Sequence, residues 1–103
     1  MANKTKFIIT EKDFSPLSSK FKILSEESRL KILQILQSGE KSVKEIVEES
    51  GFLQANVSKQ LKLLNDFNIV QFRTEGKQHF YQIKDKQVLK ICRIICESSR
   101  ENA

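Results

Sequence analysis

Residues 42–83 read SVKEIVEESGFLQANVSKQLKLLNDFNIVQFRTEGKQHFYQI, and they contain the clearest structural signals of the chain. It opens on Ser42 with Glu45 three residues later, a pair that caps a helix start by bonding to each other's backbone. Ile46 and Val47 then supply an apolar inner face, and Gly51 can adopt the left-handed conformation that ends a helix. The segment predicts a short helix of about two turns.

Only Phe52 and Leu53 separate this helix from a second helical pattern. One stripe of that pattern is apolar and comprises Leu53, Val57, Leu61 and Leu64. At about 100° per residue, the opposite arc comprises Gln54, Ala55, Ser58, Lys59 and Lys62. Two helices joined so tightly predict a helix-turn-helix, whose second helix presents its start to the DNA major groove. We expect the second arc to face DNA.

Two β-rich runs follow, at residues 69–73 and 78–83. Thr74-Glu75-Gly76-Lys77 joins them as a hairpin with glycine in the turn. The hairpin predicts a two-stranded wing beside the helix-turn-helix. We expect Arg73, Lys77 and Gln78 to line this wing, within reach of the DNA backbone.

Three further helical patterns flank this stretch. Ser15-Pro16 predicts the start of a first helix, and Ser25, followed by two acidic residues, predicts the start of a second that ends at Gly39. Asp85 predicts the cap of a last helix running to about Ser99. The apolar arc of that last helix comprises Val88, Leu89, Ile91, Cys92, Ile95 and Cys96.

The whole chain therefore predicts a mainly α fold of five helices plus a two-stranded wing. Residues 1–13 have no sustained period and are expected to form an N-terminal arm before one domain at residues 14–103. A domain of this size is marginally stabilised by its own core, so dimerisation would help. The amphipathic last helix also needs a partner surface.

The charge of the chain favours a polyanionic partner. Lys and Arg total 18 against 13 Asp and Glu, giving a formal net charge of +5. The excess lies in residues 1–24 and 51–84, whereas residues 25–50 are net acidic and expected to face away from a nucleic acid.

Several classes of protein do not fit the sequence. No apolar run approaches the roughly 20 residues that span a bilayer, and no signal segment is evident, so we expect a cytoplasmic protein without a membrane partner. The chain has no Gly-rich phosphate loop, histidine-based triad or evident carboxylate pair, which argues against an enzyme. His79 is the only histidine and is expected to be a polar surface residue.

Three segments, FKILSEESRLKIL (residues 21–33), VSKQLKLL (57–64) and GKQHFY (76–81), resemble the ArsR/SmtB family of winged-helix repressors. The similarity covers about residues 15–100. It implies a homodimer built from the first and last helices, which binds a palindromic operator in double-stranded DNA and leaves it when an inducer arrives. Residues 14–103 would then form a winged helix-turn-helix domain with terminal dimerisation helices.

The resemblance implies which residues contact DNA. Base-reading positions fall on Gln54, Ala55, Ser58 and Lys59, and wing contacts on Arg73, Lys77 and Gln78. The chemistry agrees, because glutamine pairs bidentately with adenine, serine and lysine serve bases or phosphates, and alanine offers a methyl group. Leu53 stands where the family commonly has a serine N-cap. The alternative is a winged helix that contacts protein or RNA.

Neither familiar metal site of the family is complete here. The positions of a Cys-x-Cys on the third helix hold Ser42 and Lys44. A site on the last helix reads Asp85-x-Gln87 and Ser98-x-x-Glu101, without the histidines. Oxygen ligands without imidazole make a poor site for zinc or cobalt.

Cys92 and Cys96 remain as candidate sensor thiols. Their spacing puts both on one helix face with Cβ atoms about 5–6 Å apart, farther than the roughly 3.8 Å of a disulfide. Three roles stay open: ligation of a soft metal ion, with or without the same pair from a second subunit; oxidation or an intersubunit bridge, with oxidation favoured if Arg93 lowers a thiol pKa; or packing alone. The metal is unknown, and no other cofactor is expected. The predicted function is a repressor released through these thiols; the alternative is a constitutive binding module without an inducer site.

Overall fold

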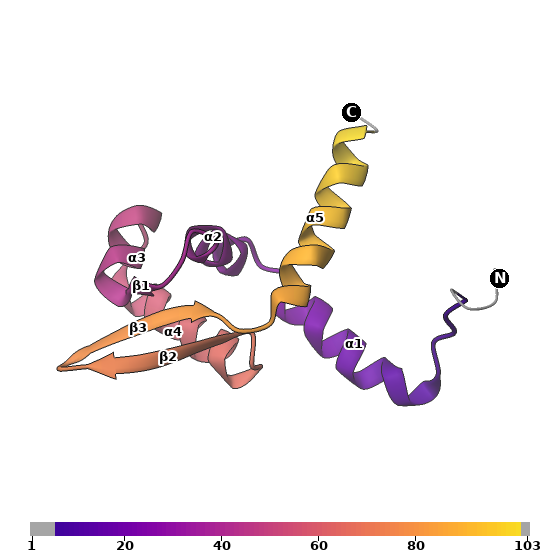
Figure 1. Ribbon diagram of the computed structural model, residues 1–103, viewed down its shortest axis with the longest axis horizontal. Coiled ribbons are helices and arrows are strands. Elements are labelled where there is room, and N and C mark those ends of the chain that lie inside the picture. The colour runs from indigo at the N-terminus through magenta and orange to yellow at the C-terminus, as the bar shows by residue number, and fades with distance from the viewer. Residues whose placement is uncertain (1–5, 102–103) are drawn as a thin grey trace.

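The computed structural model describes residues 6–101, in which five helices accompany a three-stranded antiparallel sheet (Figure 1). In chain order the elements are α1 (Glu11–Ile23), α2 (Glu27–Leu36), β1 (Lys41–Ser42), α3 (Val43–Ser50), α4 (Gln54–Asp66), β2 (Val70–Glu75), β3 (Gln78–Ile83) and α5 (Lys86–Glu101). The mainly α class with a β wing is confirmed. Residues 1–5 of the predicted arm lie outside the described residues.

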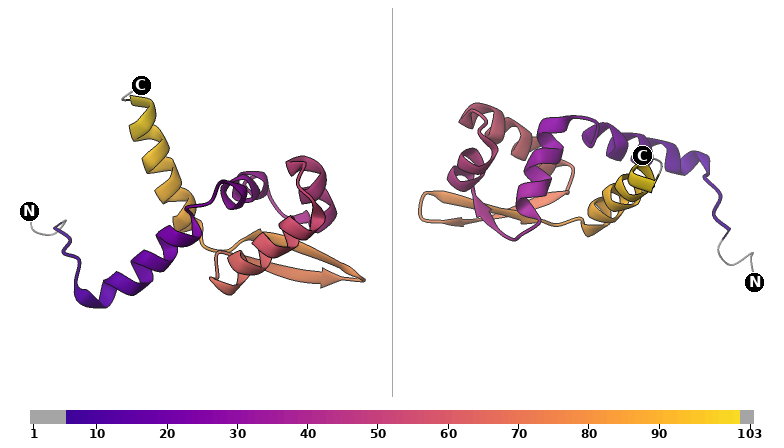
Figure 2. Two further views of the ribbon diagram at one scale, coloured as in Figure 1. Left: turned by 180° about the vertical axis from the view of Figure 1, so that it is seen from behind. Right: turned by 90° about the horizontal axis from the view of Figure 1, so that it is seen from above.

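The core lies where α2, α3, α4 and the base of the sheet meet. Its fully buried side chains are Ile32, Ile46, Val57, Leu61, Leu64, Ile69, Val70 and Val88. Val88 anchors only the first turn of α5. Figures 1 and 2 show α1 and α5 at the end of the molecule opposite the wing tip, projecting away from the body in different directions. None of the described helices is long and apolar enough to cross a membrane.

The first helix begins earlier than Ser15, so that prediction is wrong. Helix α1 starts at Glu11, because the backbone N–H of Thr10 donates to Asp13 Oδ2 at 2.8 Å and its hydroxyl bonds to the same atom at 2.9 Å. Pro16 lies inside the helix. This local cap at Thr10 precedes the proline signal and sets the start.

The second helix also differs at its start. Glu26, not Ser25, is the N-cap residue of α2. The Ser25 hydroxyl instead donates to the Lys22 carbonyl at 2.7 Å, which satisfies an orphan carbonyl at the end of α1.

The turn between α3 and α4 is confirmed in detail. The Ser42 hydroxyl accepts from the Glu45 N–H at 3.1 Å, and Glu45 Oε1 accepts from the Ser42 N–H at 2.8 Å. The bond from the Ser42 backbone also lowers the pKa of Glu45. Gly51 ends α3 with a left-handed φ of 75°. The path from α3 into α4 is therefore set by local bonds.

The wing has one strand more than predicted. Strand order is β1-β3-β2, and β1 pairs Lys41 with Tyr81 and Ser42 with Phe80. A two-residue strand is too short to leave a periodic signal in the sequence. The hairpin turn is also tighter than expected, because Thr74 and Glu75 already pair with β3 and only Gly76 and Lys77 form the turn.

Leu53 departs from the predicted apolar stripe of α4. Val57, Leu61 and Leu64 are completely buried, whereas Leu53 is 81% exposed. Leu53 is the N-cap residue with extended backbone angles, φ −65° and ψ 146°, so its side chain does not follow the helical stripe.

Candidate nucleic-acid interface

The predicted reading arc of α4 is open to solvent. The side chains of Gln54, Ala55, Ser58, Lys59 and Lys62 are all exposed. They lie on the side of the helix away from the buried stripe. Seen from behind in Figure 2, α4 crosses in front of the sheet. The structure thus brings these five residues together on one accessible helix face.

The charges on this face are largely free of strong partners. Lys62 Nζ lies 3.4 Å from Asp66 Oδ2, but both side chains are at least half exposed. Exposed pairs of this kind contribute at most about 1 kcal/mol, so this pair does not prevent Lys62 from contacting a phosphate.

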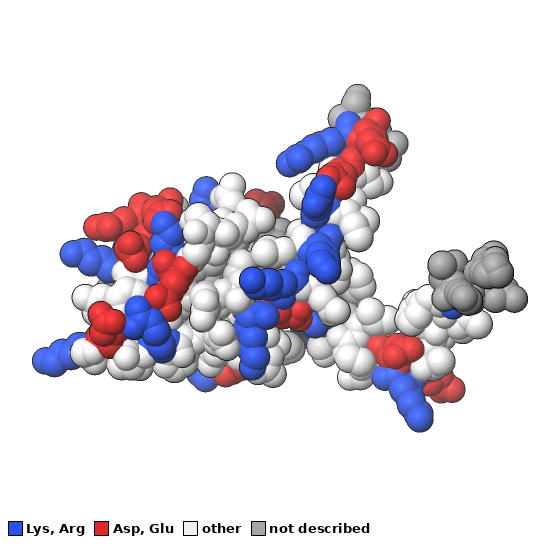
Figure 3. Space-filling view, viewed as in Figure 1, with Lys and Arg blue, Asp and Glu red and all other residues white. Residues whose placement is uncertain are grey.

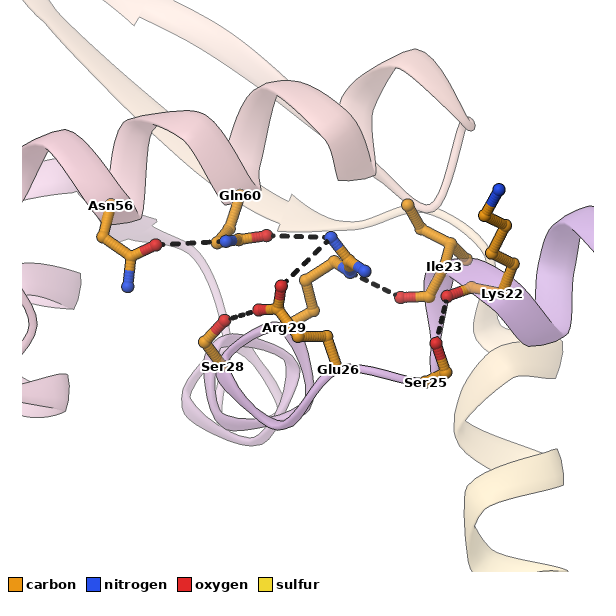
Figure 4. Close-up of polar contacts among 8 residues, drawn as sticks. All are labelled: Lys22, Ile23, Ser25, Glu26, Ser28, Arg29, Asn56 and Gln60. Atoms are coloured by element: carbon orange, nitrogen blue, oxygen red, sulfur yellow. Dashed lines mark hydrogen bonds and ion pairs between the residues drawn. The ribbon is translucent and has the colours of Figure 1, made fainter.

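A buried polar network contacts α4 on the side opposite its exposed polar arc (Figure 4). Gln60 is 3% exposed; its Oε1 accepts from Arg29 Nη1 at 3.1 Å and its Nε2 donates to Asn56 Oδ1 at 3.0 Å. Arg29 Nε also donates to the Ile23 carbonyl at 2.7 Å. One arginine on α2 therefore joins the end of α1 to the middle of α4.

Sequence reasoning missed this network. Gln60 lies three residues after Val57 and four before Leu64, which places it on the buried side of the helix. A polar residue at such a position needs a hydrogen-bonding partner. That spacing was the available signal, although it did not identify Arg29 as the partner.

The predicted contact residues of the wing differ in whether their side chains are free to bind DNA. Lys77 lies in the turn and Gln78 at the start of β3, and both are exposed. Arg73 is instead bound by two carboxylates: Nε and Nη2 each donate to Glu40 at 2.9 Å, and Nη1 donates to Glu75 at 2.7 Å. These bonds, with those to Glu40 contributing most, raise the pKa of Arg73.

The remaining contacts of the wing are aromatic. The Arg73 guanidinium carbon lies 4.7 Å from the centre of the Phe80 ring. On the opposite face, His79 stacks on Phe72 with ring centroids 4.6 Å apart and an interplanar angle of 13°. His79 is exposed, as predicted. Within residues 6–101, no group of three or more His, Cys, Asp or Glu side chains could hold a metal ion.

The charge pattern around these elements is mixed (Figure 3). Acidic side chains gather over α3, and both signs occur along the wing. Glu40, from the net acidic segment, reaches Arg73 on the wing. The acidic segment therefore extends to one of the predicted contact residues.

Comparison with known proteins identifies the family of this winged helix. Residues 26–71 match the bacterial regulatory proteins of the arsR family, from the N-cap of α2 into β2. Over 70 residues the chain is 39% identical to the arsenical resistance operon repressor of Staphylococcus aureus, which covers 68% of this chain and 67% of that protein. The chain belongs to the ArsR family.

Solved structures agree with the ArsR-family fold. The AntR antimony-specific transcriptional repressor matches with a TM-score of 0.83 and 27% identity, over 95% of this chain and 90% of that chain. The homodimeric winged helix-turn-helix DNA-binding domain Mb0332 from Mycobacterium bovis matches with a TM-score of 0.78 and 24% identity, over 91% and 90%. Membership in the ArsR family makes this chain a DNA-binding transcriptional regulator and not an enzyme.

In this ArsR-family chain the two cysteines face an apolar groove. The groove measures about 940 Å³ and lies between α1, α2 and α5. Its apolar lining includes Phe21, Leu24, Leu30, Leu33, Leu89 and Ile95. Cys92 is half-buried and Cys96 is exposed. Neither thiol forms a disulfide within the described residues.

Arg93 does not lower the pKa of Cys92, so the structure gives no support to an activated thiol at this position. Arg93 is 77% exposed at its side chain and donates from Nε to Glu97 at 2.9 Å. Burial, with a smaller effect of Cys96, raises the pKa of Cys92 instead of lowering it. Cys92 is therefore a protonated thiol at neutral pH.

Asp85 caps α5 as predicted and has a second partner. Its Oδ1 accepts from the Gln87 N–H at 3.0 Å, and its Oδ2 accepts from Lys20 Nζ at 2.6 Å. The Lys20 ammonium is the main reason that the pKa of Asp85 is lowered. Asp85 lies at a ligand position of the last-helix metal site described above. Its carboxylate instead forms an ion pair with Lys20 that links α1 to α5.

Proposed function

We propose that this ArsR-family chain is a homodimeric repressor that binds a palindromic operator in double-stranded DNA. The observation that carries the proposal is the exposed face of α4, where Gln54, Ala55, Ser58, Lys59 and Lys62 all reach solvent together. A recognition helix reads bases with residues near its start, which fits the position of Gln54 as the first residue of α4. Binding to the chromosome would place the protein in the cytoplasm.

Each residue of the proposed interface has a chemical role. Gln54 would pair with adenine, while Ser58 and Lys59 would contact bases or phosphates. Lys62, Lys77 and Gln78 would contact the backbone and fix the register. Arg73 would have to exchange Glu40 and Glu75 for a phosphate.

The apolar surfaces of α1 and α5 support the homodimer. Large side chains there are about half exposed in a single chain, among them Phe14 at 58%, Phe21 at 53% and Ile95 at 54%. A second copy would cover them, and Mb0332, which has this fold, is homodimeric. Two recognition helices would then read half-sites about 34 Å apart.

The thiol pair is the proposed place for release from DNA. Cys92 and Cys96 line the groove that the second copy would cover, so a soft metal ion or an oxidant acting there would change the angle between the two subunits. Such a change releases DNA only if the two states differ in affinity for it. Relatives include an arsenical resistance operon repressor and an antimony-specific repressor, which favours a thiophilic inducer over a hard cation.

DNA binding is tested by selecting duplexes from a random pool and measuring affinity against salt. Lys59→Ala is expected to weaken binding and reduce the salt slope by about one if Lys59 contacts a phosphate. Gln54→Ala is expected to relax base preference at one position per half-site. Finding neither effect would put the reading face elsewhere.

Release is tested by titrating the selected duplex before and after adding peroxide, persulfide, or zinc and copper salts. A sensor loses affinity in at least one condition, and the Cys92→Ser, Cys96→Ser double variant does not. Unchanged affinity throughout would make the chain a constitutive binding module. A double variant that still responds would move the sensor elsewhere.

A further inference from the structure

Leu53 is a large apolar side chain at the start of the proposed recognition helix, and the part of the chain that the structure describes leaves it open to solvent. It is 81% exposed, more than any other described large hydrophobic side chain. As N-cap residue it makes no side-chain cap bond, although this position favours a hydrogen-bonding side chain. The Leu53 side chain therefore contributes neither to the core nor to the cap, although the Leu53 carbonyl accepts the first backbone bonds of α4.

The second copy in the proposed dimer is not the partner of Leu53. The groove between α1, α2 and α5 does not include it among its lining residues. Figure 2 shows the start of α4 next to α3, at the side of the body away from α1 and α5. A dimer formed through those terminal helices leaves Leu53 at the end of α4 that would enter the groove of DNA.

The residues next to Leu53 indicate which part of the DNA its side chain would contact. Gln54 and Ala55, both exposed, follow it directly in the chain. Glutamine pairs with N6 and N7 of adenine, and the thymine opposite carries a 5-methyl group in the same major groove. That methyl group is the apolar feature of the groove that a leucine can contact.

We infer that Leu53 contacts a thymine 5-methyl group in each half-site and is a specificity-determining residue of this chain. The inference rests on the proposed DNA-binding function. Leucine replaces the hydrogen bond of a capping side chain with an apolar contact to one base. The chain thereby selects thymine over cytosine or uracil at that position.

The test replaces single thymines by deoxyuridine in a duplex selected by the wild-type protein. Deoxyuridine keeps every hydrogen-bonding group and lacks only the methyl group. Burying one such carbon corresponds to about 0.8 kcal/mol, so one substitution is expected to weaken binding about fourfold, and symmetrical substitution in both half-sites about fifteenfold. In Leu53→Ala the same substitution should change affinity less than twofold.

Two control variants assign the contact. Lys59→Ala should bind more weakly overall but remain sensitive to deoxyuridine. Ala55→Gly should also remain sensitive; if it loses the sensitivity while Leu53→Ala keeps it, the methyl contact belongs to Ala55 and the inference is overturned. Wild-type protein that binds a duplex yet tolerates deoxyuridine at every thymine overturns it as well.

Leu53→Ser separates the DNA contact from folding. Serine restores an N-cap acceptor, so the melting temperature should rise while the deoxyuridine effect disappears. A loss of thermal stability in Leu53→Ser would show that leucine has a structural role. If the wild-type protein selects no duplex at all, the proposed function itself fails, and this outcome is distinct from all the others.

Discussion

Arg29 Nη1 on α2 lies 3.1 Å from Gln60 Oε1 on α4, and this hydrogen bond links α2 to the proposed recognition helix (Figure 4). The same arginine donates to the Ile23 carbonyl at the end of α1. Its side chain is only 12% exposed, so water competes weakly for these bonds. The position of α4 is therefore coupled to the end of α1.

Gln60→Ala is expected to lower the free energy of unfolding by about 1–3 kcal/mol, because Arg29 keeps its charge but loses a buried acceptor. DNA affinity should fall as well, since α4 is less firmly oriented although Gln60 itself is buried. Urea denaturation and duplex titration measure the two effects.

A double-mutant cycle with Arg29→Ala checks the cause of that loss. If the two side chains act through their mutual bond, the losses of unfolding free energy in the two single variants add up to more than the loss in the double variant. Strictly additive losses would mean that each residue acts through other contacts.

Glu40→Gln is expected to tighten DNA binding. In the free protein Glu40 accepts two bonds from Arg73, so removing its charge frees the guanidinium for a phosphate. The affinity should rise severalfold and the salt slope should steepen by about one. Titration at several salt concentrations measures both.

Glu97→Gln is the matched control for Glu40→Gln. It removes the same charge from an arginine pair of the same 2.9 Å length, but on α5. Equal effects of both variants would show that net charge alone acts and that Arg73 does not contact DNA.

Asp85→Ala is expected to cost about 1 kcal/mol for the lost cap of α5 and less than about 1 kcal/mol for the partly exposed pair with Lys20. Asp85→Asn keeps a capping oxygen and should lose only the second contribution. Thermal or urea unfolding of the three proteins separates them. Equal losses in both variants would contradict a role for the cap.

The contribution of the Asp85 charge should also depend on pH. Its pKa is lowered below the ordinary value of an aspartate on folding, chiefly by the bond from Lys20, so the ionised form stabilises the folded state. This stabilisation is complete above the unfolded-state pKa and disappears as the pH falls through the folded-state pKa. The difference in unfolding free energy between wild type and Asp85→Asn should therefore be full near pH 6 and shrink below about pH 4. A difference that persists in acid would show that the charge is not its cause.

Cys92 is expected to react slowly with iodoacetamide at neutral pH. Burial raises the pKa of its thiol above the ordinary value, so the thiolate that reacts is scarce. In a Cys96→Ser variant the alkylation rate should rise about tenfold per pH unit up to about pH 9. Mass spectrometry follows the reaction, with Cys92→Ser as the control. Rapid alkylation near pH 7 would instead indicate an activated thiol and favour oxidation as the signal.

Local sequence signals determined the central part of the fold. Ser42 with Glu45, and Gly51 nine residues after Ser42, set the start and end of α3, because every bond involved lies within a few residues. Asp85 likewise capped α5 as expected, since its acceptor lies two residues from the donor. The polar arc of α4 followed from helical periodicity, and all its members are exposed.

Tertiary structure decided the contacts that position and occupy this interface. Arg29 and Gln60 are 31 residues apart, Glu40 and Arg73 are 33 apart, and Lys20 and Asp85 are 65 apart. A charged side chain carries no local mark of its partner, which depends on how the helices and the wing pack. The two-residue strand β1 was decided in the same way, because it forms only by pairing with β3. Local signals in the chain therefore predicted the family, the helix-turn-helix and the exposed polar arc of α4, whereas packing decided which polar groups hold α4 in place.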